Sequence, residues 1–261
     1  MAHPPLQGLR VLLTRPHPHN DNLQAALTAN GAETRCLPLL AIEPVAETPA
    51  LRQSLMNLDL YQAIVVVSPN AARIGLELIE QYWPQLPVGL EWLAVGKGTA
   101  NQLAQAGIRA LVPDDGHDSE ALLRLPRLQE VAGQRVLILR GQGGRELLSE
   151  TLRERGARVD YAELYRRAAP DHPPVQVQAL FDEFQPRVTL LFSGETFDFL
   201  WQFAQAAGPA LQEALQRTEL WLPSTRAVDK ARSYGLQRVH LMTGLDDTSV
   251  VRDLAALHVQ E

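Results

Sequence analysis

The sequence predicts an α/β protein built from two similar lobes, each a parallel sheet with helices on both faces. Two observations support this prediction. Apolar runs of strand length alternate with helical patterns along most of the chain, which is typical of parallel sheets. The order of the segments also recurs about 125 residues further along the chain, as it does in an internal repeat.

The clearest segment runs from Val136 to Leu148. It begins with an apolar run that has the composition of a strand buried on both faces. A glycine-rich loop follows, and then a helical pattern that ends before Gly156. The start of such a helix exposes unpaired backbone N–H groups, which attract an anion. The segment therefore predicts half of a βαβ unit with an anion-binding loop.

The internal repeat is visible at the ends of the predicted strands. Arg15 and Arg140 lie 125 residues apart, and each follows an apolar run. The same separation relates Ser68 to Ser193, and each of these serines follows a strand-like run. Farther along the chain the separation grows to 128, as between Gly107 and Gly235 in positions after a helical pattern. We therefore expect two copies of one α/β half.

Within one copy, strands and helices alternate. Strands are predicted at 63–67, 92–95 and 110–112, and helices from positions 70, 97 and 119 onwards. Such alternation places helices on both faces of a parallel sheet. Segments 35–44 and 161–170 are extended, bounded by proline and related by about the same separation. We expect them to be paired strands that connect the two lobes.

Two domain layouts fit this pattern. Each repeat could form one lobe, or the chain could leave the first lobe, build the second and return. The second layout is preferred, because two matching connectors then cross together and the proline-rich stretch 168–174 forms the return linker. It gives a discontinuous first lobe from 1–37 plus 171–261, a second lobe from 42–164, and connectors at about 35–44 and 161–170.

Composition excludes several classes of protein. With 46% hydrophobic and 21% charged residues, the 261-residue chain is expected to be globular, and its net charge of −6 argues against a general nucleic-acid binder. No apolar run approaches the ~20 residues of a membrane span. The first ten residues lack the apolar core of a secretion signal, and Cys36 is the single cysteine. We expect a cytoplasmic monomer without disulfides.

Nucleotide and metal motifs fail on spacing. A dinucleotide fingerprint beginning at Gly141 would need glycine where Glu146 stands, and a P-loop ending at Lys97 would need glycine where Glu91 stands. His17 and His19 have no cysteine or acidic cluster beside them. We therefore expect neither a nucleotide nor a metal.

Serines stand at the ends of two predicted strands. Ser68 is followed by Pro69, and Ser193 is followed by Gly194. Each serine can cap the helix that begins there, or it can bind a ligand at the carboxyl edge of the sheet, where open α/β sheets bind ligands. Both interpretations remain open, and both can hold together.

Arginines end the related strands. Arg15 and Arg140 follow the first strand of each copy, and Gly141 opens the loop after Arg140. These arginines can form ion pairs across the sheet edge, or they can bind carboxylate or phosphate groups. Tyr165, in the second connector, is either an ordinary strand residue or a residue that faces the cleft between the lobes.

Taken together, these segments resemble the uroporphyrinogen-III synthase family over nearly the whole chain. Their order and spacing, more than any one motif, carry the resemblance. The segments are LLTRP at 12–16, VVSPNA at 66–71, AVGKGTANQLAQAG at 94–107, LILRGQGGREL at 137–147, ELYRR at 163–167 and FSGE at 192–195.

The resemblance implies two flavodoxin-like lobes, joined by a two-stranded connector, in a lyase of heme and siroheme biosynthesis. The substrate would be hydroxymethylbilane, a linear tetrapyrrole with eight carboxylates. It would lose its terminal hydroxyl and close with inversion of ring D to uroporphyrinogen III. No metal or organic cofactor is implied. A cleft of helix N-termini, serines and arginines suits so many carboxylates.

The resemblance also implies roles for individual residues. Tyr165 matches the favoured general acid, and we expect it to reach the substrate from the connector without being buried in either core. Thr99 matches a threonine that follows the family's glycine turn. In the second copy Ala227 takes that position, so the role is assigned to Ser224 and Thr225. The predicted substrate-binding residues are Arg15, Ser68, Thr99, Arg140, Gly141, Ser193, Gly194, Ser224 and Thr225.

A non-catalytic, two-lobed binder of polycarboxylates would share many of these features. The product formed from hydroxymethylbilane distinguishes the two hypotheses, because uroporphyrinogen I is the spontaneous product. A nucleotide-dependent enzyme is a third and more distant alternative.

Overall fold

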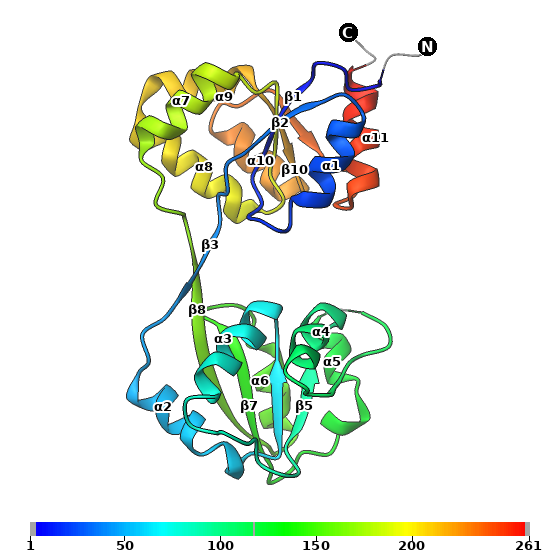
Figure 1. Ribbon diagram of the computed structural model, residues 1–261, viewed down its shortest axis with the longest axis vertical. Helices are drawn as coiled ribbons and strands as arrows, with labels where there is room; N and C mark the ends of the chain where they lie inside the picture. The colour runs from blue at the N-terminus through cyan, green and yellow to red at the C-terminus, as the bar shows by residue number, and fades with distance from the viewer. Residues whose placement is uncertain (1–3, 117, 259–261) are drawn as a thin grey trace. The chain divides into compact units, whose positions relative to one another are not determined.

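The computed structural model describes residues 4–116 and 118–258, which form two compact units (Figure 1). Unit 1 contains the residues up to Ala41 and those from Ala168 onwards, and unit 2 contains Ile42–Arg167. The chain passes between the units at two places. One lies in β3 (Ala41–Pro44) and the other at the end of β8 (Arg158–Ala168).

The sheet of unit 1 has five strands in the order β11-β10-β9-β1-β2, and all their pairings are parallel. The strands are β1 (Arg10–Leu13), β2 (Glu33–Cys36), β9 (Val188–Leu190), β10 (Glu219–Leu222) and β11 (Val239–Leu241). Numbered within the unit, the order is that of flavodoxin, 2-1-3-4-5 read from the β2 edge. The predicted parallel sheet is therefore confirmed for this unit.

Helices cover both faces of that sheet (Figure 1). Val11 and Leu13 face α1 (Asp21–Ala29) and α11 (Asp247–His258), whereas Leu12 faces the opposite side. The helices on that side are α7 (Pro174–Phe184), α8 (Gly194–Ala207), α9 (Pro209–Arg217) and α10 (Thr225–Ser233). This alternation follows from the two-residue period of a strand and explains why the run reads as apolar throughout.

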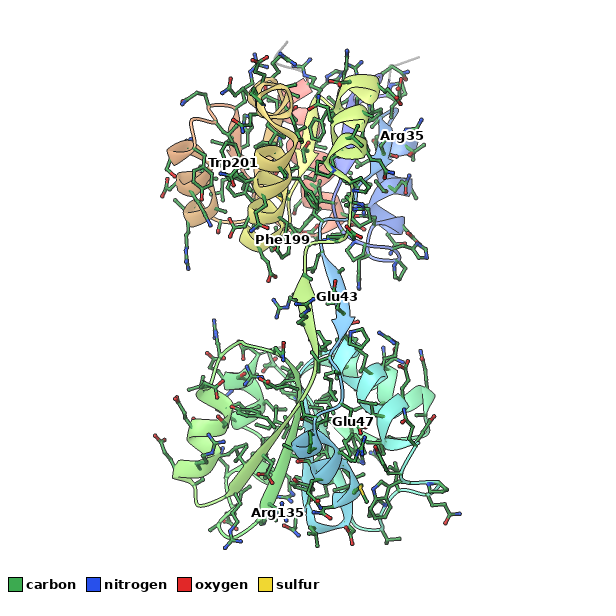
Figure 2. The ribbon with its side chains drawn as sticks, turned by 90° about the vertical axis from the view of Figure 1, so that its left-hand side faces the viewer. Arg35, Glu43, Glu47, Arg135, Phe199 and Trp201 are labelled. Atoms are coloured by element: carbon green, nitrogen blue, oxygen red, sulfur yellow. The ribbon has the colours of Figure 1, made fainter. Side chains whose placement is uncertain are left out.

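The sheet of unit 2 has six strands in the order β3-β8-β7-β4-β5-β6. Besides β3 and β8 they are β4 (Ala63–Val66), β5 (Glu91–Ala94), β6 (Ala110–Leu111) and β7 (Arg135–Gly141). The strands β8-β7-β4-β5-β6 take the same places as β2-β1-β9-β10-β11 in unit 1. In unit 2, however, β7 and β8 come after the other strands in the sequence. The added strand β3 lies beside β8, where Glu43 (labelled in Figure 2) pairs with Arg166 at 2.7 Å.

Two sets of helices cover the sheet of unit 2. On one face lie α2 (Pro49–Met56), α3 (Pro69–Ile79) and α4 (Lys97–Gln105), and on the other lie α5 (Ser119–Leu123) and α6 (Leu147–Glu154). Two short 3₁₀ helices span Leu58–Leu60 and Pro126–Leu128. In the part of the chain that the structure describes, none of the helices could span a membrane.

The predicted internal repeat is confirmed by the positions of the elements. The pairs β1 and β7, β9 and β4, and α8 and α3 each begin 125 residues apart, whereas α4 and α10 begin 128 apart. The three additional residues lie in α8, which has 14 residues where α3 has 11. The two units therefore share one frame, with their elements joined in a different order.

Two details of the predicted connectors are wrong. Segment 35–44 is not one strand, because β2 ends at Cys36 and β3 begins at Ala41. Between them Leu37 and Leu39 are buried in the core of unit 1, which ties this stretch to that unit. Segment 161–170 lies mostly within β8, which pairs with β7 as far as Tyr165 and so belongs to the sheet of unit 2.

We propose that the two units unfold as separate cooperative bodies, and a matched pair of substitutions tests this. Leu12 and Leu137 occupy equivalent, fully buried positions in β1 and β7. Leu12→Ala should lower the free energy of opening by about 2–5 kcal/mol for amides of unit 1 only, and Leu137→Ala should do the same for unit 2. Hydrogen exchange read by mass spectrometry measures both effects. Equal loss of protection in both units from either substitution would show one cooperative body.

Candidate functional site

The strand order leaves a crevice at the carboxyl edge of each sheet. In unit 2 the chain reverses its direction of winding between β7 and β4, and in unit 1 it does so between β1 and β9. A pocket of about 200 Å³ lies at this edge of unit 2. Its lining includes Ser68, Arg140, Gly141, Arg145, Tyr165 and Arg167. Ligands of open α/β sheets bind at such positions.

Ser68 and Tyr165 meet in this pocket. Ser68 is the N-cap of α3, and its Oγ accepts a hydrogen bond from the N–H of Ala71 at 3.0 Å. The same Oγ lies 2.9 Å from the Oη of Tyr165. The capping interpretation of Ser68 is therefore confirmed, and its hydroxyl is in addition paired with the predicted general acid.

The expectation that Tyr165 stays outside the cores is wrong. Only 4% of Tyr165 is exposed, and its ring belongs to the apolar cluster between the sheet and α2, α3 and α4. The physical reason is that β8 continues as a sheet strand through this position, with Tyr165 beside Gly141 of β7. Tyr165 also lines the pocket, and its Oη is paired with Ser68, so it is a core residue at the wall of the site.

Arg140 is bonded to its own loop. Its Nη1 lies 3.1 Å from Oε1 of Glu146, its Nε donates to the carbonyl of Gly141 at 3.2 Å, and its Nη2 donates to the carbonyl of Gly143. Only 6% of Arg140 is exposed. Gly143 and Gly144 have φ of 71° and 99°, a conformation that favours glycine and turns the loop back over the guanidinium. Arg140 was predicted either to form an ion pair or to bind an anionic ligand, and in the structure it forms an ion pair with Glu146.

Tyr161 and Glu146 complete this network, and neither was among the predicted site residues. Tyr161 Oη donates to the carboxylate of Glu146, and the guanidinium of Arg140 lies 4.7 Å from the centre of the Tyr161 ring. The hydrogen bond from Tyr161 holds the pKa of Glu146 below its ordinary value, and burial raises the pKa of Tyr161. Their positions in the sequence could have indicated both residues. Tyr161 precedes Tyr165 by four residues on the same strand, and Glu146 ends the glycine loop.

Arginines from three places in unit 2 line the pocket. Arg145 is exposed and pairs with Glu120 of α5 at 2.9 Å, while Arg167 lies at the end of β8. With Arg140, three arginines line the pocket, and the described part of the chain contributes no carboxylate to its lining. Arg140 and Arg145 are each paired with a carboxylate, so what the arginines offer an anion is N–H donors and not a net positive charge.

The equivalent edge of unit 1 has different contacts. The guanidinium of Arg15 lies 3.4 Å from the centre of the Phe192 ring, and burial lowers its pKa. Ser193 caps α8 in a reciprocal capping box with Thr196, and Ser224 caps α10 through the N–H of Ala227 at 3.3 Å. The interpretation of Ser193 as a helix cap is therefore confirmed.

The remaining predicted residues stand at the starts of helices. Gly194 and Thr225 are the first residues of α8 and α10, and Thr99 is the third residue of α4 with 2% of its surface exposed. Their contacts with substrate, like those of Arg15, Ser193 and Ser224, stay predictions. His17 pairs with Asp21 at 2.9 Å on the surface, and no group of His, Cys, Asp or Glu in the described ranges could hold a metal ion.

A larger pocket of about 820 Å³ lies at the amino edge of unit 1 and is lined by four arginines, Arg10, Arg187, Arg217 and Arg238. Arg10 donates to the carbonyl of Gln185 at 2.9 Å, and Arg238 donates to the carbonyl of Arg217 at 3.4 Å. These carbonyls end α7 and α9, so the two arginines act as caps of helix C-termini. We therefore place the candidate site at the carboxyl edge of unit 2, although the pocket there is smaller.

Sequence relatives point to one family. A family model described as uroporphyrinogen-III synthase HemD matches residues 21–243. The chain is 31% identical over 250 residues to the uroporphyrinogen-III synthase of Escherichia coli (strain K12). This alignment covers 94% of this chain and 100% of the relative. It is 36% identical over 168 residues to that of Proteus mirabilis, which covers 63% of this chain and 83% of the relative.

Solved structures of such enzymes share the fold. Uroporphyrinogen-III synthetase from Helicobacter pylori 26695 matches with a TM-score of 0.57 at 11% identity, over 95% of this chain and 99% of that one. A mutant uroporphyrinogen III synthase from the extremely thermophilic bacterium Thermus thermophilus matches with a TM-score of 0.55 at 20% identity, over 97% and 99%. Since the fold agrees, and the family model and the Escherichia coli relative span most of the chain, the chain belongs to the uroporphyrinogen-III synthase family.

Proposed function

We propose that the carboxyl edge of unit 2 is where this chain acts on hydroxymethylbilane, with Tyr165 as the general acid. As a member of its family the chain is a lyase, which cyclises this substrate to uroporphyrinogen III with loss of water. The observation that carries the proposal is the pairing of Tyr165 Oη with Ser68 Oγ at 2.9 Å, at the start of α3.

In the acid step, one proton must reach the oxygen of the terminal hydroxymethyl group as that oxygen departs. The C–O bond of the terminal hydroxymethyl group breaks as the lone pair of the pyrrole nitrogen moves in. Tyr165 Oη gives its proton to the departing hydroxide, which leaves as water. The substituted α-carbon of ring D then bonds to the methylene carbon that has lost its hydroxyl, which gives a spiro intermediate. The bond from that ring carbon to its original methylene bridge breaks, and the unsubstituted α-carbon of ring D bonds to the released methylene. This carbon loses its hydrogen as a proton, which restores the phenol and leaves ring D inverted. One water is lost in total, and the protein is unchanged.

Ser68 and α3 stabilise the phenolate that forms during this step. The Ser68 hydroxyl can donate its hydrogen to Tyr165 Oη, because its Oγ serves the helix only as an acceptor from Ala71. This orientation leaves the phenol proton available to the substrate. The N-terminus of α3 adds a positive partial charge beside the developing anion.

Arginines and loop N–H groups are the proposed partners of the substrate carboxylates. Arg145 and Arg167 line the pocket, and charge-assisted hydrogen bonds of this kind are worth roughly 1.5–3 kcal/mol each. Arg145 is exposed, whereas the guanidinium of Arg140 is buried and bonded to its own loop, so Arg140 has a different proposed role. It holds the loop in the shape that presents these groups.

We also propose that the chain acts as a monomer in the cytoplasm. The one cysteine, Cys36, is exposed and unpaired, which suits a reducing compartment. Sedimentation of the purified chain at several concentrations tests the monomer, since a self-associating chain would sediment faster as its concentration rises.

The product isomer tests the function. The chain is incubated with freshly made hydroxymethylbilane, and the porphyrins are separated after oxidation. Uroporphyrin III is the expected isomer. Uroporphyrin I alone, the product of spontaneous closure, would indicate a binder of polycarboxylates, an alternative that the family match does not favour.

Tyr165→Phe should lower the turnover number by about 10²–10⁴-fold, the usual effect of losing a general acid. The fold should persist, because the ring stays in place and only one oxygen is lost. Steady-state rates at neutral pH, with the share of isomer I, measure the effect.

The matched control is Tyr61→Phe. Tyr61 is also buried in unit 2, and its hydroxyl donates to Asp160 at 2.8 Å at the amino edge of the sheet. This change should cost stability but leave turnover unchanged. If Tyr165→Phe turns over at nearly the normal rate, Tyr165 is a packing residue and not the acid.

Glu146→Gln tests the role of the loop network. The pKa of Glu146 is lowered in the folded chain, chiefly by the hydrogen bond from Tyr161. Its carboxylate therefore stabilises the fold above the ordinary pKa of 4.5, and this contribution is lost as the pH falls through the lowered folded value. Glu146→Gln should thus weaken the chain at pH 7, with the difference shrinking towards zero at more acidic pH.

Urea unfolding at several pH values measures this difference, and amide exchange of residues 141–146 locates it. The control is Glu77→Gln, which removes an exposed ion pair with Arg73 on α3. It should leave exchange in the loop unchanged. A Glu146→Gln effect that does not depend on pH would show that the ionised carboxylate does not hold the loop.

A further inference from the structure

An irregularity in the sheet turns Tyr165 towards the site. Along β7 and β8, Arg140 is opposite Glu163, but the next residue, Gly141, is opposite Tyr165. Leu164 is therefore an extra residue in β8, which is the definition of a β-bulge. Without it, Leu164 and Tyr165 would point to opposite faces of the sheet. With it, both side chains are buried in the same cluster, on the face covered by α3.

The Tyr165 ring occupies the space that a side chain at position 141 would fill. A Cβ built on Gly141 would lie 2.6 Å from Cε2, 2.7 Å from Cζ and 3.1 Å from Cδ2 of Tyr165. The backbone does not require glycine here, since Gly141 is not one of the glycines with positive φ. The glycine is therefore needed for the tyrosine ring that lies against it.

This contact fixes where the hydroxyl points. The two closest ring atoms include Cζ, which bears the hydroxyl, so a side chain at position 141 would displace the reacting end of the ring. Tyr165 Oη now lies 2.9 Å from Ser68 Oγ. A hydrogen bond from the N–H of Gln142 to the carbonyl of Tyr165, at 2.7 Å, holds the two strands together at this point.

The arrangement is absent from the other copy of the repeat. The positions equivalent to Gly141 and Tyr165, at a separation of 125, are Pro16 and Leu40. There β1 ends at Leu13 and β2 at Cys36, so the two strands are no longer paired at these positions. The bulge and the missing side chain thus distinguish unit 2 from a frame that the two units otherwise share.

We infer that Gly141 is a positioning residue for the reaction, acting through Tyr165 and not through a contact of its own with the substrate. The inference rests on the proposed role of Tyr165 as the acid. The lack of a side chain at position 141, together with the bulge at Leu164, keeps the phenol against Ser68. Any side chain at this position moves the phenol away from the departing hydroxide.

A double-mutant cycle tests the inference. Gly141→Ala should lower the turnover number by about 10²-fold, the effect of misplacing a catalytic group by about an ångström. The Michaelis constant should change little. In the Tyr165→Phe background the same substitution should cost less than about 3-fold in turnover, since no hydroxyl remains to be displaced.

Gly75→Ala is the matched control for steric strain in the same core. A Cβ on Gly75 would lie 2.8 Å from Leu139 Cδ1 and 3.2 Å from Leu164 Cδ1, and its three nearest atoms include none of Tyr165. This variant should unfold more easily, yet keep its turnover number. Circular dichroism and thermal unfolding of every variant separate loss of fold from loss of rate.

A second test, in a Tyr165→Leu variant, decides the question if the Gly141→Ala protein does not fold. Tyr165→Leu removes the ring and so the clash, and Gly141→Ala should then be tolerated without further loss of stability. If Tyr165→Leu folds but its combination with Gly141→Ala does not, position 141 needs glycine for its backbone, and the inference is wrong.

The remaining outcomes separate this inference from the proposed function. Equal losses of turnover from Gly141→Ala with and without the Tyr165 hydroxyl would mean that Gly141 contacts the substrate itself, which overturns the inference alone. Normal turnover in Tyr165→Phe would overturn the acid role of Tyr165, and the inference with it. A large loss in Tyr165→Phe together with normal turnover in a folded Gly141→Ala variant would overturn the inference and leave the acid role standing.

Discussion

Parallel strands joined through helices must all end at the same edge of a sheet, and the site depends on this constraint. Ser68 follows β4 and Gly141 ends β7, which are neighbours in the sheet of unit 2 although 73 residues separate the two positions. The same geometry places the start of α3 at that edge, with its unpaired N–H groups. Because helices cover both faces of the sheet, its edges are where a polar ligand can approach the strands.

The sequence was sufficient to predict this frame. Apolar runs marked the buried strands, and the serine and proline at 68 and 69 marked the start of α3, because a hydroxyl cap and a first-turn proline suit a helix start. The separations of 125 and 128 recur in the strands and helices of the structure. Each of these signals is local, or compares two local patterns, so it needs no knowledge of how the chain packs.

The details of the site depend on packing and could not be predicted in the same way. The two-residue period of a strand would place Leu164 and Tyr165 on opposite faces, and nothing in ELYRR marks the bulge that puts them on one. Likewise, an arginine at the end of a strand is compatible with a ligand or with an internal partner. For Arg140 the outcome is set by the path of the glycine loop, which brings a carbonyl and a carboxylate to the guanidinium.

A comparison of the two serine caps explains why the proposed acid step belongs to unit 2. At a separation of 125, Thr196 of unit 1 is equivalent to Ala71 of unit 2. In unit 1 the Thr196 hydroxyl lies 3.2 Å from the Ser193 hydroxyl and accepts from its backbone N–H, so Ser193 is engaged within its own cap. Alanine at position 71 offers no such group, and Ser68 keeps its hydroxyl for Tyr165.

The same comparison applies to the aromatic partner. Leu40 stands where unit 2 has Tyr165, so unit 1 lacks a phenol at the equivalent position. Two changes, in a helix cap and in a strand, therefore separate the edges of two otherwise similar sheets. One edge has a phenol paired with a serine hydroxyl, whereas the other has a serine engaged in its own helix cap and an arginine stacked on Phe192.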